Sequence, residues 1–171
     1  MAVKGLKNVL SNLKKFGSEA AVEIDIATMA TADAIERSAK TNVTKNLNHL
    51  GKSIHRVRLG EADYKVVVGA DYGAYVEFGT GAKVQVPTEM QEIASQFKNK
   101  KSGSFEAGLR AIKDWCKNKG IDQSAAYPIF ISILNKGIQP QPFLYPAFVK
   151  GRKQYIKDLK KVLKKLTKKY E

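Results

Sequence analysis

The sequence predicts an α+β fold, in which a long N-terminal helix and further helices pack a small, mainly antiparallel β-sheet. Three observations support this prediction. Apolar residues recur at spacings of three and four over residues 3–41, as they do on one face of a helix. Two short segments with strand patterning follow, at 53–59 and 64–68. Helical periodicity then returns and continues into a basic C-terminal helix, residues 150–170.

The N-terminal helix is expected to be amphipathic along its length. Its apolar stripe consists of Leu6, Val9, Leu10, Leu13, Phe16, Ala20, Ile24, Ala27, Ala34, Ile35 and Ala39. Gly17 and Ser18 mark a potential break, whereas the alanine-rich second half favours helix and lets neighbouring elements approach closely. Because a helix of this length cannot bury its own apolar face, we expect it to lie on a sheet or on another subunit.

The strands are expected to form a hairpin. Residues 42–52 are rich in turn formers and predict a loop. Residues 53–59 alternate apolar and polar side chains, residues 64–68 are rich in β-branched ones, and Gly60–Asp63 lies between them as a turn.

The next apolar segment is ambiguous. Tyr75, Val76 and Phe78 are expected to form a third short strand or a tight helix-to-strand turn, which Gly79 and Gly81 end. A lone strand would expose Glu77, because alternate side chains point to opposite faces. We then expect Glu77 to form a salt bridge, within the fold or across a subunit contact.

The second half is expected to be helical. Thr88 and Gln91 have the spacing of a capping box at the start of one helix. The others are expected near 105–118, from about Ser124 to Gly137, and over Lys150–Tyr170, with an extended Gln139–Pro142 segment before the last.

Length and charge predict one domain with a basic tail. The chain has 171 residues and a formal net charge of +14, of which residues 150–171 hold ten basic and two acidic residues. We expect residues 1–150 to form one α+β domain and residues 151–171 an amphipathic helix continuous with it. The field of such a chain favours anionic partners. One cysteine, no signal-peptide pattern and no spanning apolar run predict a soluble intracellular chain without an internal disulfide.

The usual signatures of enzymes and metal sites are missing. His49 and His55 do not combine with the single cysteine at any zinc spacing. Cys116 lies on an apolar stripe beside Trp115, which favours core packing over catalysis. Residues 79–83 lack the Gly-Lys-Ser/Thr of a phosphate loop. We therefore predict a protein that is not an enzyme, with no catalytic residue, no metal and no cofactor.

The lysines of the C-terminal helix are candidate contacts to DNA or to an acidic partner surface. The candidates are Lys157, Lys160, Lys161, Lys164, Lys165 and Lys168. Ten cations in this segment could neutralise several phosphates, yet no base-reading motif or stacking platform accompanies them. The alternative is a solvated lysine face around a packed helix, and the sequence leaves both open.

Three stretches together resemble one protein family. They are Gly73–Gly81 (Gly-Ala-Tyr-Val-Glu-Phe-Gly-Thr-Gly), Trp115–Gly120 and Gly137–Phe148, which contains Gln-Pro-Phe-Leu-Tyr-Pro-Ala. The chain resembles the tail-completion, or head–tail joining, family of tailed phages, whose members are often labelled neck protein or minor tail component. The order of its elements is kept from about residue 5 to 165, and only residues 42–54 depart from the family pattern.

The resemblance implies a structural virion protein. It would be a ring-forming neck or tail-completion protein that joins the head connector to the tail. Its implied partners are further copies of itself in a hexameric ring, head-closure or connector proteins, tail terminator or tube proteins, and packaged DNA, but no membrane. It would be assembled in the host cytoplasm and located in the virion. The alternatives are a tail terminator-type ring protein and a stand-alone basic nucleic-acid-binding protein.

The family motif residues have two readings, as protomer structure or as subunit contacts. They are Tyr75, Glu77, Phe78, Gly79, Gly81, Pro142, Phe143 and Pro146. We expect Pro142, Phe143 and Pro146 to form a stiff extended arm that pins the C-terminal helix to the sheet carrying Tyr75 and Phe78.

Overall fold

The computed structural model describes residues 6–43, 47–80, 86–92 and 105–170. These residues confirm an α+β fold with one two-stranded antiparallel sheet. Contacts divide the chain into two compact units, Met1–Ala70 with Phe143–Glu171, called unit 1, and Asp71–Pro142, called unit 2. The predicted boundaries, 1–150 and 151–171, remain a prediction, and the last helix crosses position 150 without interruption.

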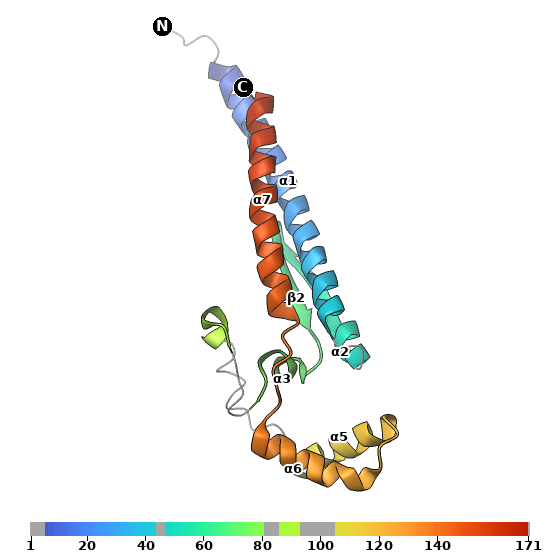
Figure 1. Cartoon of the computed structure of the whole chain (residues 1–171). Helices are drawn as coiled ribbons and strands as arrows, with labels where there is room; N and C mark the ends of the chain where they lie inside the picture. Colours follow the sequence, from blue (N-terminus) through green and yellow to red (C-terminus); the bar gives the residue numbers. More distant parts are fainter. Residues whose placement is uncertain (1–5, 44–46, 81–85, 93–104, 171) are drawn as a thin grey trace. The chain divides into compact units, whose positions relative to one another are not determined.

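Unit 1 is built on two long helices, α1 (Leu6–Asn42) and α7 (Leu144–Tyr170). They lie side by side and antiparallel (Figure 1). Contacts at the C-terminal end of α7 and near its middle set the register. Lys169 Nζ pairs with Glu19 at 2.7 Å, Lys165 Nζ with Glu23 at 2.9 Å, and the hydroxyls of Tyr155 and Thr28 are hydrogen-bonded at 2.9 Å.

Small residues let the two helices approach closely in the C-terminal third of α1. The buried positions are Ala32, Ile35 and Ala39 on α1, and Ala147, Gly151 and Leu166 on α7. A methyl group added at Gly151 would lie 2.4 Å from Cγ1 of Ile35. Only glycine therefore fits at this crossing without a shift of Ile35.

A hairpin packs against α1 and bonds to it between Asp25 and Glu36. Strand β1 (Ile54–Gly60) pairs antiparallel with β2 (Asp63–Val68), so that Arg56 lies opposite Val66 and Arg58 opposite Tyr64. The ranges predicted for the two strands are confirmed to within a residue or so. A short helix, α2 (Asn48–Ser53), precedes β1 where the sequence predicted only loop.

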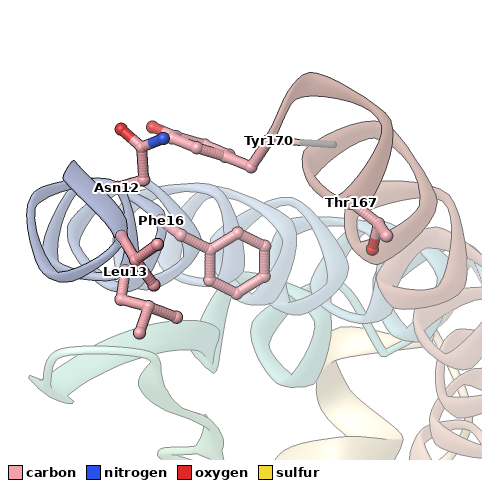
Figure 2. A pocket seen from close by; sticks show the side chains of 6 residues that line it. Asn12, Leu13, Phe16, Thr167 and Tyr170 are labelled. Atoms are coloured by element: carbon pink, nitrogen blue, oxygen red, sulfur yellow. The ribbon is translucent and has the colours of Figure 1, made fainter. Parts of the chain in front are cut away.

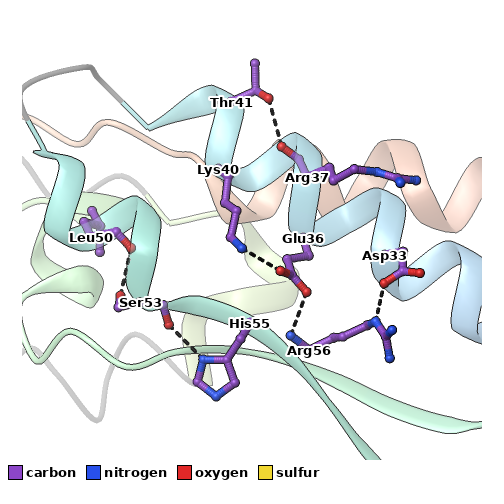
Figure 3. Close-up of polar contacts among 9 residues, drawn as sticks. All are labelled: Asp33, Glu36, Arg37, Lys40, Thr41, Leu50, Ser53, His55 and Arg56. Atoms are coloured by element: carbon purple, nitrogen blue, oxygen red, sulfur yellow. Dashed lines mark hydrogen bonds and ion pairs between the residues drawn. The ribbon is translucent and has the colours of Figure 1, made fainter.

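Acidic residues of α1 fix the hairpin (Figure 3). The Arg56 backbone N–H donates to Glu36 at 2.9 Å, and the Arg56 side chain pairs with Asp33. At the far end Asp25 accepts from the Arg58 guanidinium at 3.0 Å and from the Ala62 N–H at 2.8 Å. Ala62 has a φ of 51°, a left-handed conformation that is unfavourable for residues other than glycine. The hydrogen bond from its N–H to Asp25 therefore stabilises a strained turn.

Unit 2 is helical in the part that the structure describes. Its elements are α3 (Gly73–Phe78), η3 (Thr88–Met90), α5 (Phe105–Asn118), η4 (Gln123–Ala125) and α6 (Ala126–Lys136). Helices α5 and α6 contact each other, with Cys116, Ala126 and Phe130 buried. Burial of Cys116 confirms its predicted packing role.

Several local predictions were wrong for identifiable reasons. Helix α1 passes through Gly17 and Ser18 without a break. Thr88 is not an N-cap, because the cap position of η3 is Pro87 and no side chain bonds there. The remainder of that predicted helix, beyond Glu92, lies outside the described residues.

The start of the last helix was also placed wrongly. Helix α7 begins at Leu144 rather than Lys150, and Pro146 lies in its first turn. There its missing N–H costs no helical hydrogen bond. The predicted extended arm therefore ends at Phe143.

Gly151 and Gly17 provide a matched test of the helix packing. Gly17→Ala should raise the free energy of unfolding by about 0.5–1 kcal/mol, because nothing lies within 4 Å of the added methyl and alanine favours helix. Gly151→Ala should lower it by up to about 2 kcal/mol, because overpacking against Ile35 outweighs the gain in helix propensity. Urea unfolding followed by circular dichroism measures both values. Equal stabilisation by the two substitutions would contradict the close packing of α1 against α7.

Candidate functional site

The first family motif is a short helix rather than a strand. Tyr75, Val76 and Phe78 lie on α3, which Gly79 ends by donating its N–H to Tyr75 O at 2.9 Å. Glu77 is therefore not exposed on a strand but buried, and it interacts with other groups of the protein. The predicted salt bridge of Glu77 remains a prediction.

The end of this motif crosses the segment that follows α6. The Thr80 N–H donates to Ile138 O at 3.1 Å, and the Ile138 N–H donates to Thr80 Oγ1 at 2.8 Å. Further along, the Gln141 N–H donates to Val76 O at 2.7 Å. These bonds join two motifs that are about sixty residues apart in the sequence, and both belong to unit 2.

Two glycines make the crossing sterically feasible. Gly79 has φ 74° and ψ −173°, and Gly137 has φ 71° and ψ 174°, a region open essentially to glycine alone. A Cβ at Gly79 would lie 2.7 Å from Ile138 O, and one at Gly137 would lie 2.1 Å from Thr80 O. The pairing of motifs thus has a structural basis within the protomer. Gly81 lies outside the described residues.

The remaining motif residues lie where the chain enters α7. Phe143 is buried, and its carbonyl accepts a hydrogen bond from Asn42 Nδ2 at 3.0 Å, which ties the end of α1 to the start of α7. Pro142 and Pro146 are exposed. Phe143 is thus the one buried anchor of this segment, and Tyr75 and Phe78 lie on a helix rather than on the sheet to which an arm was expected to attach.

Five lysines form one exposed stripe on α7. Lys153, Lys157, Lys160, Lys164 and Lys168 recur every three or four residues, so they lie on one face over about 22 Å of helix. Lys153 and Lys164 are each two positions, about 200° around the helix, from the buried Gly151 and Leu166. The stripe therefore faces away from α1. Within the described residues, none of the five lysines is paired with a carboxylate at contact distance.

Three further lysines of α7 are paired with acidic residues. Lys161 pairs with Asp158 at 3.1 Å, while Lys165 and Lys169 pair with Glu23 and Glu19 of α1. The Lys169 hydrogen bond lowers the pKa of Glu19, and the bond to Glu19 raises the pKa of Lys169.

The six predicted lysines therefore separate into two groups. Four of them, Lys157, Lys160, Lys164 and Lys168, belong to the stripe, whereas Lys161 and Lys165 are paired within the protomer. The prediction omitted Lys153, although its spacing of four from Lys157 continues the stripe. Their contacts to DNA or to a partner remain a prediction.

Two kinds of site are absent from the part of the chain that the structure describes. No group of three or more His, Cys, Asp or Glu side chains there is arranged to hold a metal ion. Among the same residues, no helix has both the length and the apolarity needed to cross a membrane.

Comparison with known proteins relates the first part of the chain to a phage family. Residues 7–79 match a family model described as "Bacteriophage HK97-gp10, putative tail-component". The match confirms the resemblance to tailed-phage tail proteins over α1, α2, β1, β2 and α3, including Tyr75–Gly79 of the first motif. The second motif, at Pro142–Pro146, lies outside the matched range. No curated protein and no solved structure matches the chain.

Gly137 and Gly120 test the motif crossing. Gly137→Ala should lower the free energy of unfolding by at least about 3 kcal/mol, because backbone strain adds to a clash with Thr80 O. Gly120 also has a positive φ, 68°, but nothing lies within 4 Å of an added methyl. Gly120→Ala should therefore cost only about 1–2 kcal/mol. Urea unfolding followed by Trp115 fluorescence measures the free energy of unfolding of both variants. An equal loss of stability in the two would show that the contact between Gly137 and Thr80 does not contribute.

The lysine stripe is tested by two triple variants that lose the same charge. Lys157, Lys160 and Lys164→Gln alters the stripe, whereas Lys161, Lys165 and Lys169→Gln alters the paired set. If the stripe contacts a DNA backbone, the first variant should reduce the slope of log Kd against log salt by about 2–3. The second should reduce it much less. Fluorescence anisotropy with duplex DNA measures the slopes, and equal slopes would mean that binding follows net charge alone.

Proposed function

We propose, from the match of residues 7–79 to the family model of a phage tail-component, that this chain is a structural protein of a tailed-phage virion. Its specific role is that of a ring-forming neck or tail-completion protein that joins the head connector to the tail. It acts through assembly rather than catalysis. The observation that carries the proposal is the family match, which covers the long helix, the hairpin and α3.

The distribution of charge supports a role next to DNA and other proteins. Unit 1 holds 21 basic and nine acidic residues, a net charge of +12, whereas unit 2 holds nine and seven, a net charge of +2. In a ring around the path of packaged DNA, the α7 stripe would line the lumen, where cations reduce repulsion between phosphates. The remaining surfaces would contact connector and tail proteins.

A ring also needs two different surfaces on each protomer, because head-to-tail contacts close a ring only when one patch fits another. Half-exposed apolar side chains are available on unit 1, among them Val22, Ile26 and Met29 of α1 and Leu59 of β1. A hexamer would match the symmetry of the tail. A terminator-type ring at the tail end is the nearest alternative, since the same fold and charge would serve it.

A stand-alone nucleic-acid-binding protein is the second candidate function, and the α7 stripe is the observation that favours it. Such a protein would bind DNA by itself, with an affinity that falls steeply as salt rises. A neck protein would instead remain with virion or tail proteins through purification. Co-purification with particles therefore separates the two.

Localisation in intact particles tests the proposed function directly. We expect cryo-EM reconstruction of the virion to place copies of this chain at the junction of head and tail, arranged as a closed ring. Removal of the gene should leave filled heads and free tails that accumulate separately, because only the joining step is lost. The absence of the chain from every virion and every assembly intermediate would disprove the proposal.

Deletion of the C-terminal part of α7 is a poor test of the role of its lysines. Leu166 is buried, and Lys165 and Lys169 hold α1, so truncation would disrupt unit 1 itself. The Lys157, Lys160 and Lys164→Gln variant leaves these contacts intact. It is therefore the cleaner variant for measuring the yield of joined particles.

A further inference from the structure

Strand β2 lies at an edge of the sheet, because the sheet in the described part of the chain has only two strands. In an antiparallel pair, the N–H and C=O of one residue point to the partner strand and those of the next residue point away from it. The Gly69 N–H donates to Ser53 O at 3.0 Å, which continues the hairpin register past the last pair of the two strands. The residues of β2 that bond to β1 are therefore those at even spacing from Gly69, namely Lys65 and Val67.

The backbone groups of Tyr64, Val66 and Val68 point to the open side of β2. Among the described residues, none donates to or accepts from these N–H and C=O groups. Strand β2 thus presents an unpaired donor and an unpaired acceptor at every second residue, about 7 Å apart along the strand. Such an edge is a template for a further strand.

The outer edge of β1, in contrast, is closed by α1. The outward N–H of Arg56 donates to Glu36 at 2.9 Å, and the Arg56 side chain pairs with Asp33. At the turn, the Ala62 N–H donates to Asp25 at 2.8 Å. Acidic residues of α1 thus occupy the edge of β1, and the open edge of the hairpin is that of β2.

The sequence of β2 suits a strand that pairs on both sides. Edge strands are commonly protected from a partner strand by proline or by a bulge. Strand β2 reads Asp-Tyr-Lys-Val-Val-Val, which contains no proline and ends in three β-branched residues. The register shift of the hairpin lies near its turn, between Arg58 and Gly60 of β1. The edge of β2 is therefore regular from Tyr64 to Val68.

The unpaired groups of β2 select the kind of partner. Outward N–H groups need acceptors and outward C=O groups need donors, in alternation along the edge. A DNA backbone offers phosphate acceptors but no donors for the carbonyls. A helix uses most of its backbone groups within itself. An extended chain offers both kinds of group at the matching spacing.

A second copy of the chain is a poor partner for this edge. Within the described residues it could offer only its own β2, because α1 closes the edge of β1. Pairing of β2 with β2 would be two-fold symmetric and would bring together two units that each carry a net charge of +12. An acidic segment of a different protein has the opposite charge and avoids this repulsion.

The side chains of β2 define the pattern of an added strand. Val66 lies opposite Arg56, which pairs with Asp33 of α1, so this face of the hairpin turns toward α1. Lys65 lies on the other face and is exposed. Because neighbouring strands alternate in the same way, the added strand would carry apolar side chains beside Val66 and acidic ones beside Lys65.

The hollow between the ends of α1 and α7 does not select a partner in this way. It has a volume of about 350 Å³, and Figure 2 shows its lining side chains, which are apolar for the most part. They are Val9, Asn12, Leu13 and Phe16 of α1 and Thr167 and Tyr170 of α7. An apolar lining accepts many kinds of partner, whereas alternating backbone groups accept an extended strand.

We propose that the edge of β2 is a docking site for an extended, acidic segment of another protein, which adds a third strand to the sheet. The N–H and C=O groups of Tyr64, Val66 and Val68 bond to its backbone, and Lys65 contacts one of its carboxylates. The inference goes beyond the proposed function, since it names a surface and a kind of partner without assigning the chain a place in the virion. Its test uses the purified full chain.

The probe is a peptide of about seven residues, blocked at both ends, in which valine alternates with glutamate. Two derivatives carry N-methyl groups, one on every valine and the other on every glutamate. The valine N–H groups face β2 if the strands are antiparallel, and the glutamate N–H groups do so if they are parallel. We therefore expect one derivative to bind like the parent peptide and the other at least about tenfold more weakly. Fluorescence anisotropy measures the three affinities.

Amide hydrogen exchange, followed by NMR, locates the bound peptide. In the free chain the N–H groups of Lys65 and Val67 should be protected by the hairpin, and those of Tyr64 and Val66 should exchange faster. Saturation with the parent peptide should slow exchange at Tyr64 and Val66 about tenfold or more. Exchange at Lys65 and Val67 should change much less, because these groups are already bonded to β1.

Two substitutions at one position separate the backbone contact from the side chain. Val66→Pro removes an outward N–H that the hairpin does not use, and an edge strand tolerates proline at such a position. Val66→Ala keeps this N–H and shortens the side chain. Val66→Pro should weaken peptide binding about tenfold and Val66→Ala much less. Circular dichroism of both variants checks that they are folded, and the methylated peptides test the same contact on the unchanged chain.

A matched pair of lysines tests the acidic character of the partner. Lys65→Gln and Lys157→Gln each remove one exposed charge, the first beside the open edge and the second from the stripe of α7. Lys65→Gln should weaken binding of the glutamate peptide about threefold, as expected for an exposed ion pair, and Lys157→Gln should have a smaller effect.

Other results would overturn the proposal. Equal binding of the two methylated derivatives, or unchanged exchange at Val66 in the presence of the peptide, would show that no strand is added to β2. Equal effects of the two lysine substitutions would show that Lys65 contacts no carboxylate. Concentration-dependent association in sedimentation that Val66→Pro abolishes would assign the edge to a second copy. None of these results bears on whether the chain lies in the neck, so the two proposals fail separately.

Discussion

The antiparallel contact between α1 and α7 is the constraint on which the rest of unit 1 depends. It brings together segments more than a hundred residues apart, so the loss of loop entropy must be offset along the whole contact. Near the N-terminal end of α7, close packing of small residues offsets this loss, as where Gly151 lies against Ile35. Further toward the C-terminal end of α7, hydrogen bonds and ion pairs of Tyr155, Lys165 and Lys169 contribute.

The same contact organises the charge of the unit. Every acidic residue of α1 is engaged, Glu19 and Glu23 with α7 and Asp25, Asp33 and Glu36 with the hairpin or with Lys40. Such exposed pairs contribute little energy individually. Instead they set the register of the elements and the distribution of charge, because the acidic residues of α1 are neutralised by basic residues of the same unit. The lysines that point away from α1 are therefore left uncompensated.

Elements in which the apolar pattern repeats several times could be predicted from the sequence. The prediction failed where a short segment was compatible with both a strand and a helical turn. The stripe from Leu6 to Ala39 and the alternation around Val57 could be recognised, because each pattern repeats several times. Tyr75–Phe78 offered too few residues to separate a strand from a helical turn. The ending at Gly79, and the contact of Gly79 with Ile138, depend on a partner segment that local sequence does not reveal.

The candidate site shows the same division. That the lysines of α7 form an amphipathic face could be predicted from spacing alone. Which of them are free could not, because this depends on the rotation of α7 relative to α1, which places Lys165 beside Glu23 and Lys157 away from it. Gly79 could be singled out from the sequence as a break, but the physical reason for glycine there is the close approach of the Ile138 backbone, which the local sequence does not reveal.

The charge of unit 1 bears on how such a protein would assemble. A net charge of +12 on unit 1 opposes contact between copies in solution, and the repulsion is strongest beside the unpaired lysine stripe of α7. Under the proposed function, an anionic partner such as packaged DNA would reduce this repulsion where the copies of a ring meet. The lysines that α1 leaves unpaired would then favour assembly in the presence of that partner over association of the chain by itself.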